Sequence, residues 1–245
     1  MRKFLALSIL AINLLVTPFV SAAPLTSSQK QELEQINKIL TENPDIIEAL
    51  HASLQSYLAS QVTMEDTLVA SHDYLYNNPV HPTLGSDKPE LTIINFTDYN
   101  CYYCKKLEGG MVEVLKDYPQ IKVVNVLLPF QQRIITGMNI SSAEFAMDVW
   151  QNHRDKFAEV HKLMLAKPGK LDKAAMIKIT ERTGTQSSLT PNPKYKGVVQ
   201  QNSQIFSNLG LRGTPSLIIG EQIIPGYMPK DQLEAAIKRA LNAQS

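Results

Sequence analysis

The feature that most constrains this chain is the segment Cys101-Tyr102-Tyr103-Cys104, which contains both cysteines of its 245 residues. It follows an apolar run, Leu91 to Phe96, that predicts a mostly buried strand. Two cysteines at this spacing on the first turn of a helix can close a small disulfide ring. Such a ring opens by thiolate attack through a mixed disulfide. The spacing therefore predicts thiol-disulfide chemistry.

Structural roles for the cysteine pair fit the sequence less well. A ring this small removes little entropy from the unfolded chain, so it would be a poor stabilising disulfide. A zinc site would need two further ligands, and the five histidines lack the paired spacing of such sites. A c-type haem attachment needs histidine where Lys105 stands. We expect no metal and no cofactor, and we expect Met138, Met147 and Met164 to fill the core.

Residues 1–22 predict an export signal. Arg2 and Lys3 precede an apolar stretch, and Ala22 ends a run of small residues suited to cleavage. Asn13 interrupts the apolar stretch, which is shorter than the ~20 residues that span a bilayer, so a membrane anchor is disfavoured. An exported chain enters a compartment in which disulfides persist. The predicted compartment therefore agrees with the predicted chemistry.

Composition excludes some classes of partner. Cleavage would remove Arg2 and Lys3 from the 24 basic residues, and the remaining 22 nearly balance the 23 acidic residues. With no basic block, nucleic acid is not expected as a partner. About 220 residues remain, enough for one core and an appended element, and no internal repeat is present.

Residues 23–78 predict two amphipathic helices. Ser28 to Gln31 fits a capping box for the first, and Asn43-Pro44 begins the second. Apolar residues of the second recur at every fourth position, at Ile46, Leu50, Leu54, Leu58 and Val62. Such stripes could pack on the rest of the chain, but a module this small cannot form its own core. We expect residues 24–78 to form a homodimer.

The remainder predicts an α/β catalytic domain. Residues 79–90 are rich in proline and glycine, which predicts a linker or a loose edge segment before a domain of residues 91–245. Residues 91–128 predict a strand, a helix and a second strand in a parallel unit with a right-handed crossover. Residues 141–208 predict a helical insert. Two short strands around Gly220-Glu221 and a C-terminal helix follow.

Two parts of the sequence resemble the thioredoxin-fold DsbA family. The first runs from Leu84-Gly85-Ser86 through the predicted strand and Thr97-Asp98-Tyr99-Asn100 to the cysteine pair. The second is Gly213-Thr214-Pro215-Ser216 with the apolar run after it, which resembles the cis-proline loop of the family. Pro225-Gly226-Tyr227 is similar to the segment that leads to its last helix. The resemblance implies a thioredoxin fold with a helical insert.

The resemblance also implies roles for individual residues. Cys101 would be the exposed nucleophile that forms the mixed disulfide, and Cys104 would resolve it. Pro215 would be cis and lie beside the pair, while Thr214 would offer its backbone to an extended substrate. Tyr102 and Tyr103 would contact the same substrate. The N-terminus of the helix would lower the pKa of Cys101.

Two departures from the family pattern stand out. Related enzymes often hold a buried acid six positions before the first cysteine, where this chain has Asn95. Asp98 is nearer to the pair, and we expect it to be solvated. No histidine lies between the cysteines, so we expect a less extreme oxidant than one with histidine there.

The helical N-terminal region and the threonine before Pro215 resemble the dimeric disulfide isomerases DsbC and DsbG. Together the resemblances imply a periplasmic enzyme that forms or isomerises disulfides in exported proteins carrying thiols or disulfides. A membrane redox partner would recycle Cys101 and Cys104. The alternative is a holdase chaperone or binding module whose disulfide is not catalytic.

Overall fold

The computed structural model describes residues 24–243, so the predicted signal of residues 1–22 lies outside the described residues. The chain consists of two compact units that meet between Gln55 and Ser56. No helix in residues 24–243 is long and apolar enough to cross a membrane.

The first unit contains α1 (Ser27–Glu42), a short 3-10 helix (Pro44–Ile46) and the start of α2 (Ile47–Asn77). The capping box of α1 is centred on Thr26, two residues before the predicted position. The Thr26 hydroxyl accepts from the amide of Gln29, and the Gln29 side chain accepts from the amide of Thr26. Thr26 has the extended backbone that an N-cap requires, whereas Ser28 lies inside the first turn.

The N-terminal helices expose their apolar side chains. No residue of α1 is buried. Of the seventeen large hydrophobic residues that are exposed in the described chain, eleven lie between Leu25 and Val69. Leu58 and Val62 of α2 are 63% and 61% exposed. An apolar surface of this extent is typical of an interaction site.

The second unit is built on a five-stranded sheet in the order β1-β3-β2-β4-β5. β2 (Leu91–Thr97) and β3 (Ile121–Leu127) are parallel, and both are buried along nearly their whole length. β1 (Thr83–Gly85) pairs antiparallel with β3, β4 (Ser216–Ile219) pairs antiparallel with β2, and β5 (Gln222–Pro225) follows at the edge. The near-continuous apolar runs of β2 and β3 suit strands covered on both faces.

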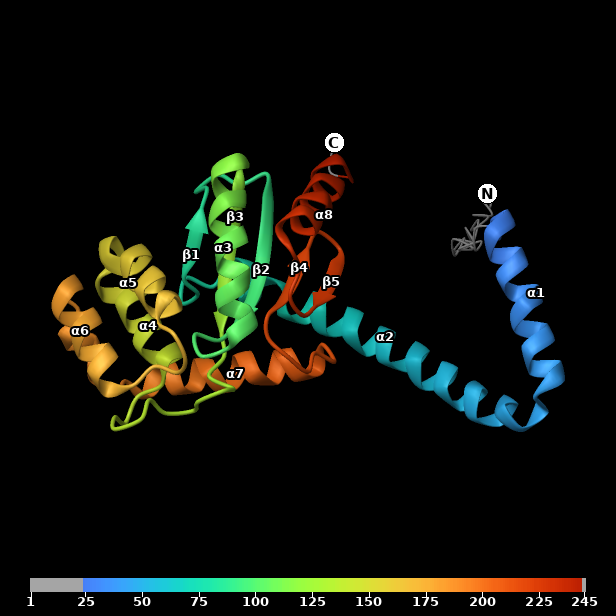
Figure 1. Ribbon diagram of the computed structural model, residues 1–245, viewed down its shortest axis with the longest axis horizontal. Coiled ribbons are helices and arrows are strands. Elements are labelled where there is room, and N and C mark those ends of the chain that lie inside the picture. Colours follow the sequence, from blue (N-terminus) through green and yellow to red (C-terminus); the bar gives the residue numbers. More distant parts are fainter. Residues whose placement is uncertain (1–23, 244–245) are drawn as a thin grey trace, which may run out of the picture. The chain divides into compact units, whose positions relative to one another are not determined.

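Helices cover both faces of this sheet (Figure 1). On one face, α3 (Tyr102–Asp117) and α8 (Lys230–Ala243) place Met111 and Leu233 in one cluster with Ile93 of β2. On the other face, α7 (Pro193–Asn208) and the last turns of α2 pack against β2 and β3. Leu75 and Phe206 meet Phe96 in that cluster.

The predicted insert of residues 141–208 is helical in the structure. It comprises α4 (Ser142–Asn152), α5 (Arg154–Ala166), α6 (Lys173–Thr183), a short 3-10 helix (Gln186–Leu189) and α7. Its helices surround a core that includes Phe145 and Phe157, and Tyr99 and Leu127 of the sheet domain belong to the same core. The insert is therefore packed continuously with the sheet domain.

Residues 79–90 are an edge segment of the catalytic domain, and the alternative prediction of a linker is wrong. Thr83 pairs with Val124 in the sheet, Val80 and His81 are buried, and the carbonyl of Pro79 accepts a hydrogen bond from the Trp150 indole at 3.0 Å. The prolines are tolerated because an edge strand leaves one side of its backbone without sheet partners. The start of the domain at residue 91 is also too late, since α2 contributes Leu75 to the core.

We predict that Leu75→Ala destabilises the catalytic domain by about 2–5 kcal/mol, because Leu75 is fully buried and its truncation leaves a cavity. Denaturant unfolding measures the loss. Val112→Ala on the exposed side of α3 is the matched control and should change stability by less than about 0.5 kcal/mol. Equal effects of the two substitutions would contradict the docking of α2.

Candidate active site

The two cysteines lie where the sequence predicts a helix to begin. Cys101 is the N-cap of α3 with an extended backbone, and Cys104 lies in the first turn. Both are free thiols in the structure. Cys101 is 7% exposed and Cys104 is 2% exposed. Cys101 is thus less exposed than the resemblance implied, although it remains the more accessible of the two.

The loop before β4 covers Cys101. The Thr214–Pro215 peptide bond is cis, as the resemblance implied, and the Sγ of Cys101 lies 3.1 Å from the carbonyl oxygen of Thr214. The pairing of β2 with β4 explains this approach, because Phe96 lies opposite Ser216. Residues just after β2 and just before β4 must therefore meet at the same edge of the sheet.

The environment of the two thiols makes them unequal. A hydrogen bond from Cys104 is the main cause that lowers the pKa of Cys101 to about 5, and burial opposes it. The side chain of Thr214 and the amides of Tyr103 and Cys104 lower it further. Burial raises the pKa of Cys104, and the hydrogen bond to Cys101 adds to the rise. At neutral pH the pair therefore holds a thiolate at Cys101 and a thiol at Cys104.

Asp98 is buried, which corrects the expectation that it is solvated. It is 1% exposed, its Oδ1 accepts from the amide of Asn100 at 2.8 Å, and its Oδ2 accepts from the amide of Gln131 at 2.7 Å. Burial raises its pKa, while these hydrogen bonds oppose the rise. The loop that follows β3 thus folds over Asp98 and joins the turn before Cys101.

A neutral pair occupies the position at which related enzymes hold a buried acid. Asn95 Nδ2 donates to Asn125 Oδ1 at 2.9 Å, and both side chains are buried. The two residues face each other because they are partners in the parallel register of β2 and β3. No charge therefore lies at this position beneath the cysteines.

The helical insert is joined to the active-site turn through contacts that no sequence motif indicated. Lys105 Nζ donates to the carbonyls of Lys167 and Gly169 in the loop between α5 and α6. The amide of Leu171 donates to Asn100 Oδ1 at 2.7 Å. These bonds fix the loop of residues 167–171 beside the cysteines.

A second connection passes through a buried histidine. The Tyr99 hydroxyl lies 2.8 Å from Nδ1 of His161 on α5, and His161 Nε2 lies 3.3 Å from the carboxylate of Glu108 on α3. His161 therefore links the active-site turn to α5 and α3. Within residues 24–243, no three histidine, cysteine or acidic side chains form a site that could hold a metal ion.

Tyr102 and Tyr103 are exposed beside Cys101, at 72% and 52%. Their rings are 5.2 Å apart, and the ring of Tyr103 is 5.9 Å from that of Tyr227. The amide of Gly226 donates to the carbonyl of Pro215 at 2.9 Å, which places Tyr227 next to the cis-proline loop. Sequence reasoning did not assign Tyr227 to the site. The sequence feature that could have assigned Tyr227 to the site is its position directly after Pro225-Gly226.

A groove in the second unit lies away from these side chains. It has a volume of about 1000 Å³ and lies between the loop after β3 and α7, with Phe130 and Gln200 among its lining residues. Neither cysteine lines it. The candidate chemistry therefore occurs at a surface edge and not in an enclosed pocket.

Known proteins show the same architecture. The profile of the thioredoxin-like domain family matches residues 83–241. Disulfide bond formation protein D of Bacillus subtilis is 22% identical over 175 residues, which are 66% of this chain and 78% of the relative.

Two solved structures extend the comparison. A linker-deletion mutant of Proteus mirabilis ScsC is 29% identical with a TM-score of 0.69, and the match covers 91% of this chain and 100% of that one. A periplasmic thioredoxin-like protein from Salmonella enterica serovar Typhimurium is 31% identical with a TM-score of 0.62. That match covers 70% of this chain and 95% of the other.

We predict that the Cys101 thiolate titrates with a midpoint near pH 5, so that it is present above this pH and is lost as the pH falls through it. Cys104→Ala should raise the midpoint because it removes the main hydrogen-bond donor. Cys104→Ser keeps a donor and should raise it less. The ultraviolet absorbance of the thiolate measures all three midpoints. A midpoint in Cys104→Ala equal to that of the wild type would refute the assigned cause.

Proposed function

Because this chain belongs to the thioredoxin-like domain family and is a DsbA-like thiol-disulfide oxidoreductase, we propose that Cys101 and Cys104 are its redox pair and that it forms or isomerises disulfides in exported proteins. The observation that carries the proposal is the unequal pair, with a thiolate-favouring sulfur against the Thr214 carbonyl and a protonated thiol one turn inside. Such a pair provides a nucleophile and a resolving group in one helix turn.

The proposed reaction runs in two directions. In the oxidised protein, a substrate thiolate attacks Cys101, the Cys101–Cys104 bond breaks, and Cys104 leaves and takes up a proton. A second substrate thiolate then attacks the mixed disulfide and releases reduced Cys101. In the reduced protein, the Cys101 thiolate attacks a substrate disulfide, and either Cys104 or another substrate thiol resolves the product.

Thr214 and Pro215 form the wall of the proposed substrate site opposite Cys101. The Thr214 carbonyl already lies against the reacting sulfur, so a chain bound along this loop would bring its own sulfur to Cys101. Tyr102 and Tyr103 flank the same position and are exposed enough to contact that chain.

The proposed compartment is the periplasm. The sequence of residues 1–22 supports export. The 31% identical protein from Salmonella enterica serovar Typhimurium, whose structure is solved, is a periplasmic thioredoxin-like protein. A catalyst that gives up or takes up two electrons must be returned to its starting state, so we infer a membrane redox partner that recycles the pair.

We predict that Cys101→Ser lowers insulin reduction to the uncatalysed rate, because it removes the attacking sulfur. Cys104→Ser should instead accumulate a mixed disulfide with the substrate, which mass spectrometry detects. Val112→Ala, exposed on α3, is the control and should retain the wild-type rate. Insulin reduction that survives in Cys101→Ser would refute the proposal. Suppression of aggregation without any redox activity would favour the holdase alternative.

We also propose that the chain self-associates through the N-terminal helices, as a homodimer. The exposed apolar residues of α1 and α2 support this, because soluble monomers rarely expose apolar surface of this extent. The interface would end before the last turns of α2, because Leu75 is already buried in the catalytic domain.

We predict that Leu58→Glu combined with Val62→Glu converts the dimer to a monomer, because charge on the stripe cannot be buried in an interface. Sedimentation gives the mass. Ile177→Glu is the matched control, an exposed apolar residue on α6 outside the stripe, and should leave the mass unchanged. A wild-type chain that sediments as a monomer would contradict self-association. A wild-type mass above that of a dimer would contradict the dimer but not self-association.

A further inference from the structure

Five segments border the thiol pair, and cations outnumber carboxylates in them. They are the active-site turn with the start of α3 (97–107), the loop after β3 (129–134), the α5–α6 loop (167–172), the cis-proline loop (209–216) and the segment after β5 (225–229). The bonds of Asp98, Lys105, Thr214 and Gly226 described above bring them together.

These segments contain six cations and two carboxylates. The carboxylates are Asp98, which is buried, and Asp172, which pairs with Lys167. The cations are Lys105, Lys106, Arg133, Lys167, Lys170 and Arg212. The whole chain has 24 basic and 23 acidic residues, so this imbalance is local and does not follow from composition.

Three of the cations are free to meet a ligand. Lys106, Arg133 and Arg212 are exposed, and none of them forms an ion pair within the described part of the chain. Arg133 lines the groove beside α7. Arg212 lies two residues before Thr214, whose carbonyl contacts Cys101. Lys106 Nζ lies 4.7 Å from the centroid of the Tyr227 ring. Both charges therefore flank the path of a chain that reacts with Cys101.

The other cations contribute to the field without being available for contact. Lys167 is paired with Asp172 at 3.0 Å, whereas Lys105 and Lys170 donate to backbone carbonyls, which do not cancel their charge. A rim of one sign raises the local concentration of ligands of the opposite sign.

The charge distribution along α3 argues for an anionic ligand. The N-terminus of a helix favours anions, yet the first turn of α3 has no acidic residue and lysines follow at positions 105 and 106. The first acidic residue of α3 is Glu108, which contacts His161, and Glu113 and Asp117 lie further along, where Lys230 of α8 pairs with them. Lysines near the N-terminus weaken the helix unless negative charge lies beside them, and the Cys101 thiolate provides that charge in the reduced pair but not in the disulfide.

We propose that the surface around Cys101 selects polypeptide segments that carry acidic residues next to a cysteine. Lys106 and Arg212 would contact the acidic side chains, and Tyr103 and Tyr227 would contact an apolar side chain of the same segment. This inference rests on the proposed oxidoreductase function and names the substrate class of that same site.

The test uses the full-length oxidised protein and three dithiol peptides that differ only in whether glutamate, glutamine or lysine flanks the cysteines. In each reaction two electrons and two protons pass from the peptide to the Cys101–Cys104 disulfide. The rate constant for each peptide with the protein is divided by the rate constant for the same peptide with a small uncharged disulfide. This division removes differences in the intrinsic reactivity of the peptide thiols. We expect the glutamate peptide to react about 10-fold faster than the lysine peptide at an ionic strength of about 0.01 M. The ratio should fall below about 2-fold at about 1 M.

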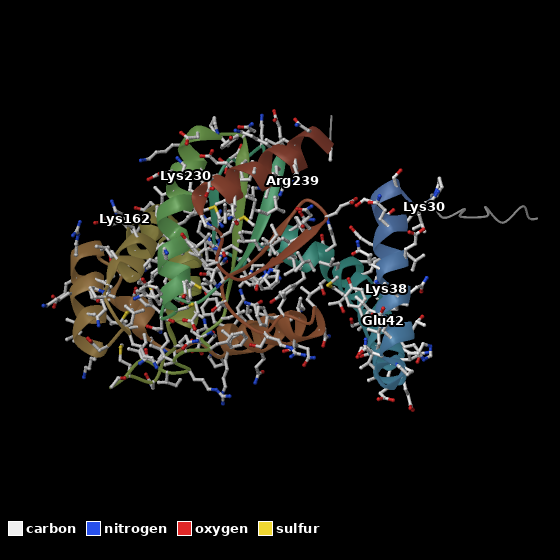
Figure 2. All side chains as sticks on the ribbon, turned by 45° about the vertical axis from the view of Figure 1, so that its right-hand side comes forward. Lys30, Lys38, Glu42, Lys162, Lys230 and Arg239 are labelled. Carbon is white, nitrogen blue, oxygen red and sulfur yellow. The ribbon has the colours of Figure 1, made fainter. Side chains whose placement is uncertain are left out.

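The variant Lys106→Glu with Arg212→Glu should abolish or invert this preference. The matched control is Lys238→Glu, an exposed lysine that forms no ion pair within residues 24–243 and precedes Arg239 of α8, which Figure 2 labels. The turn at Gly220, at the other end of β4 from the cis-proline loop, lies next to Ala240 of the same helix. The control should therefore keep the wild-type preference. Circular dichroism checks that both variants fold.

Each outcome distinguishes this inference from the proposed function. If no peptide reacts, the oxidoreductase function itself fails. If all three react equally at low salt, or the lysine peptide reacts fastest, only the acidic preference is overturned. A preference that survives Lys106→Glu with Arg212→Glu, or that Lys238→Glu reduces equally, would show that the rim does not select the substrate.

Discussion

The contact between the Cys101 sulfur and the Thr214 carbonyl, at 3.1 Å, is the interaction on which the rest of the site depends. The two residues are far apart in the chain and meet only because β2 and β4 pair with Phe96 opposite Ser216. A shift of one residue in that pairing would turn every side chain of β4 to the other face of the sheet. Burial of both faces opposes such a shift, so the hydrophobic core fixes the position of the Cys101 sulfur beside the cis-proline loop.

The charged groups near this contact lie in the segments that flank the thiol pair, whereas the polar side chains of the sheet near it are neutral. Beneath it, Asn95 and Asn125 hydrogen-bond as neutral amides within the sheet. Beside it, Asp98 accepts two backbone amides, and Lys105 donates to two carbonyls of the insert. Each charged group is held by backbone atoms, so its position does not depend on a flexible partner side chain.

Features that depend on local sequence patterns could be predicted, whereas features that depend on contacts between remote segments could not. Continuous apolar runs indicated β2 and β3, and the cysteine spacing indicated the start of α3. The sequence did not distinguish strand β1 from a linker, because a strand of three residues is too short to show an alternation of apolar and polar side chains. The burial of Asp98 and the position of Tyr227 depend on contacts with segments remote in sequence. Local periodicity cannot encode such contacts.

Oxidase and isomerase activity require the same atoms in opposite redox states. A hydrogen bond that holds Cys101 as a thiolate stabilises the reduced pair, which makes the disulfide a better oxidant. The same thiolate is present at neutral pH to attack a wrong disulfide, although lowering the pKa also lowers its intrinsic nucleophilicity. The geometry at Cys101 would therefore serve both proposed reactions, and neither is favoured by the thiol pair alone. The balance between them would then depend on which redox partner can reach the sulfur, and hence on surfaces outside the pair.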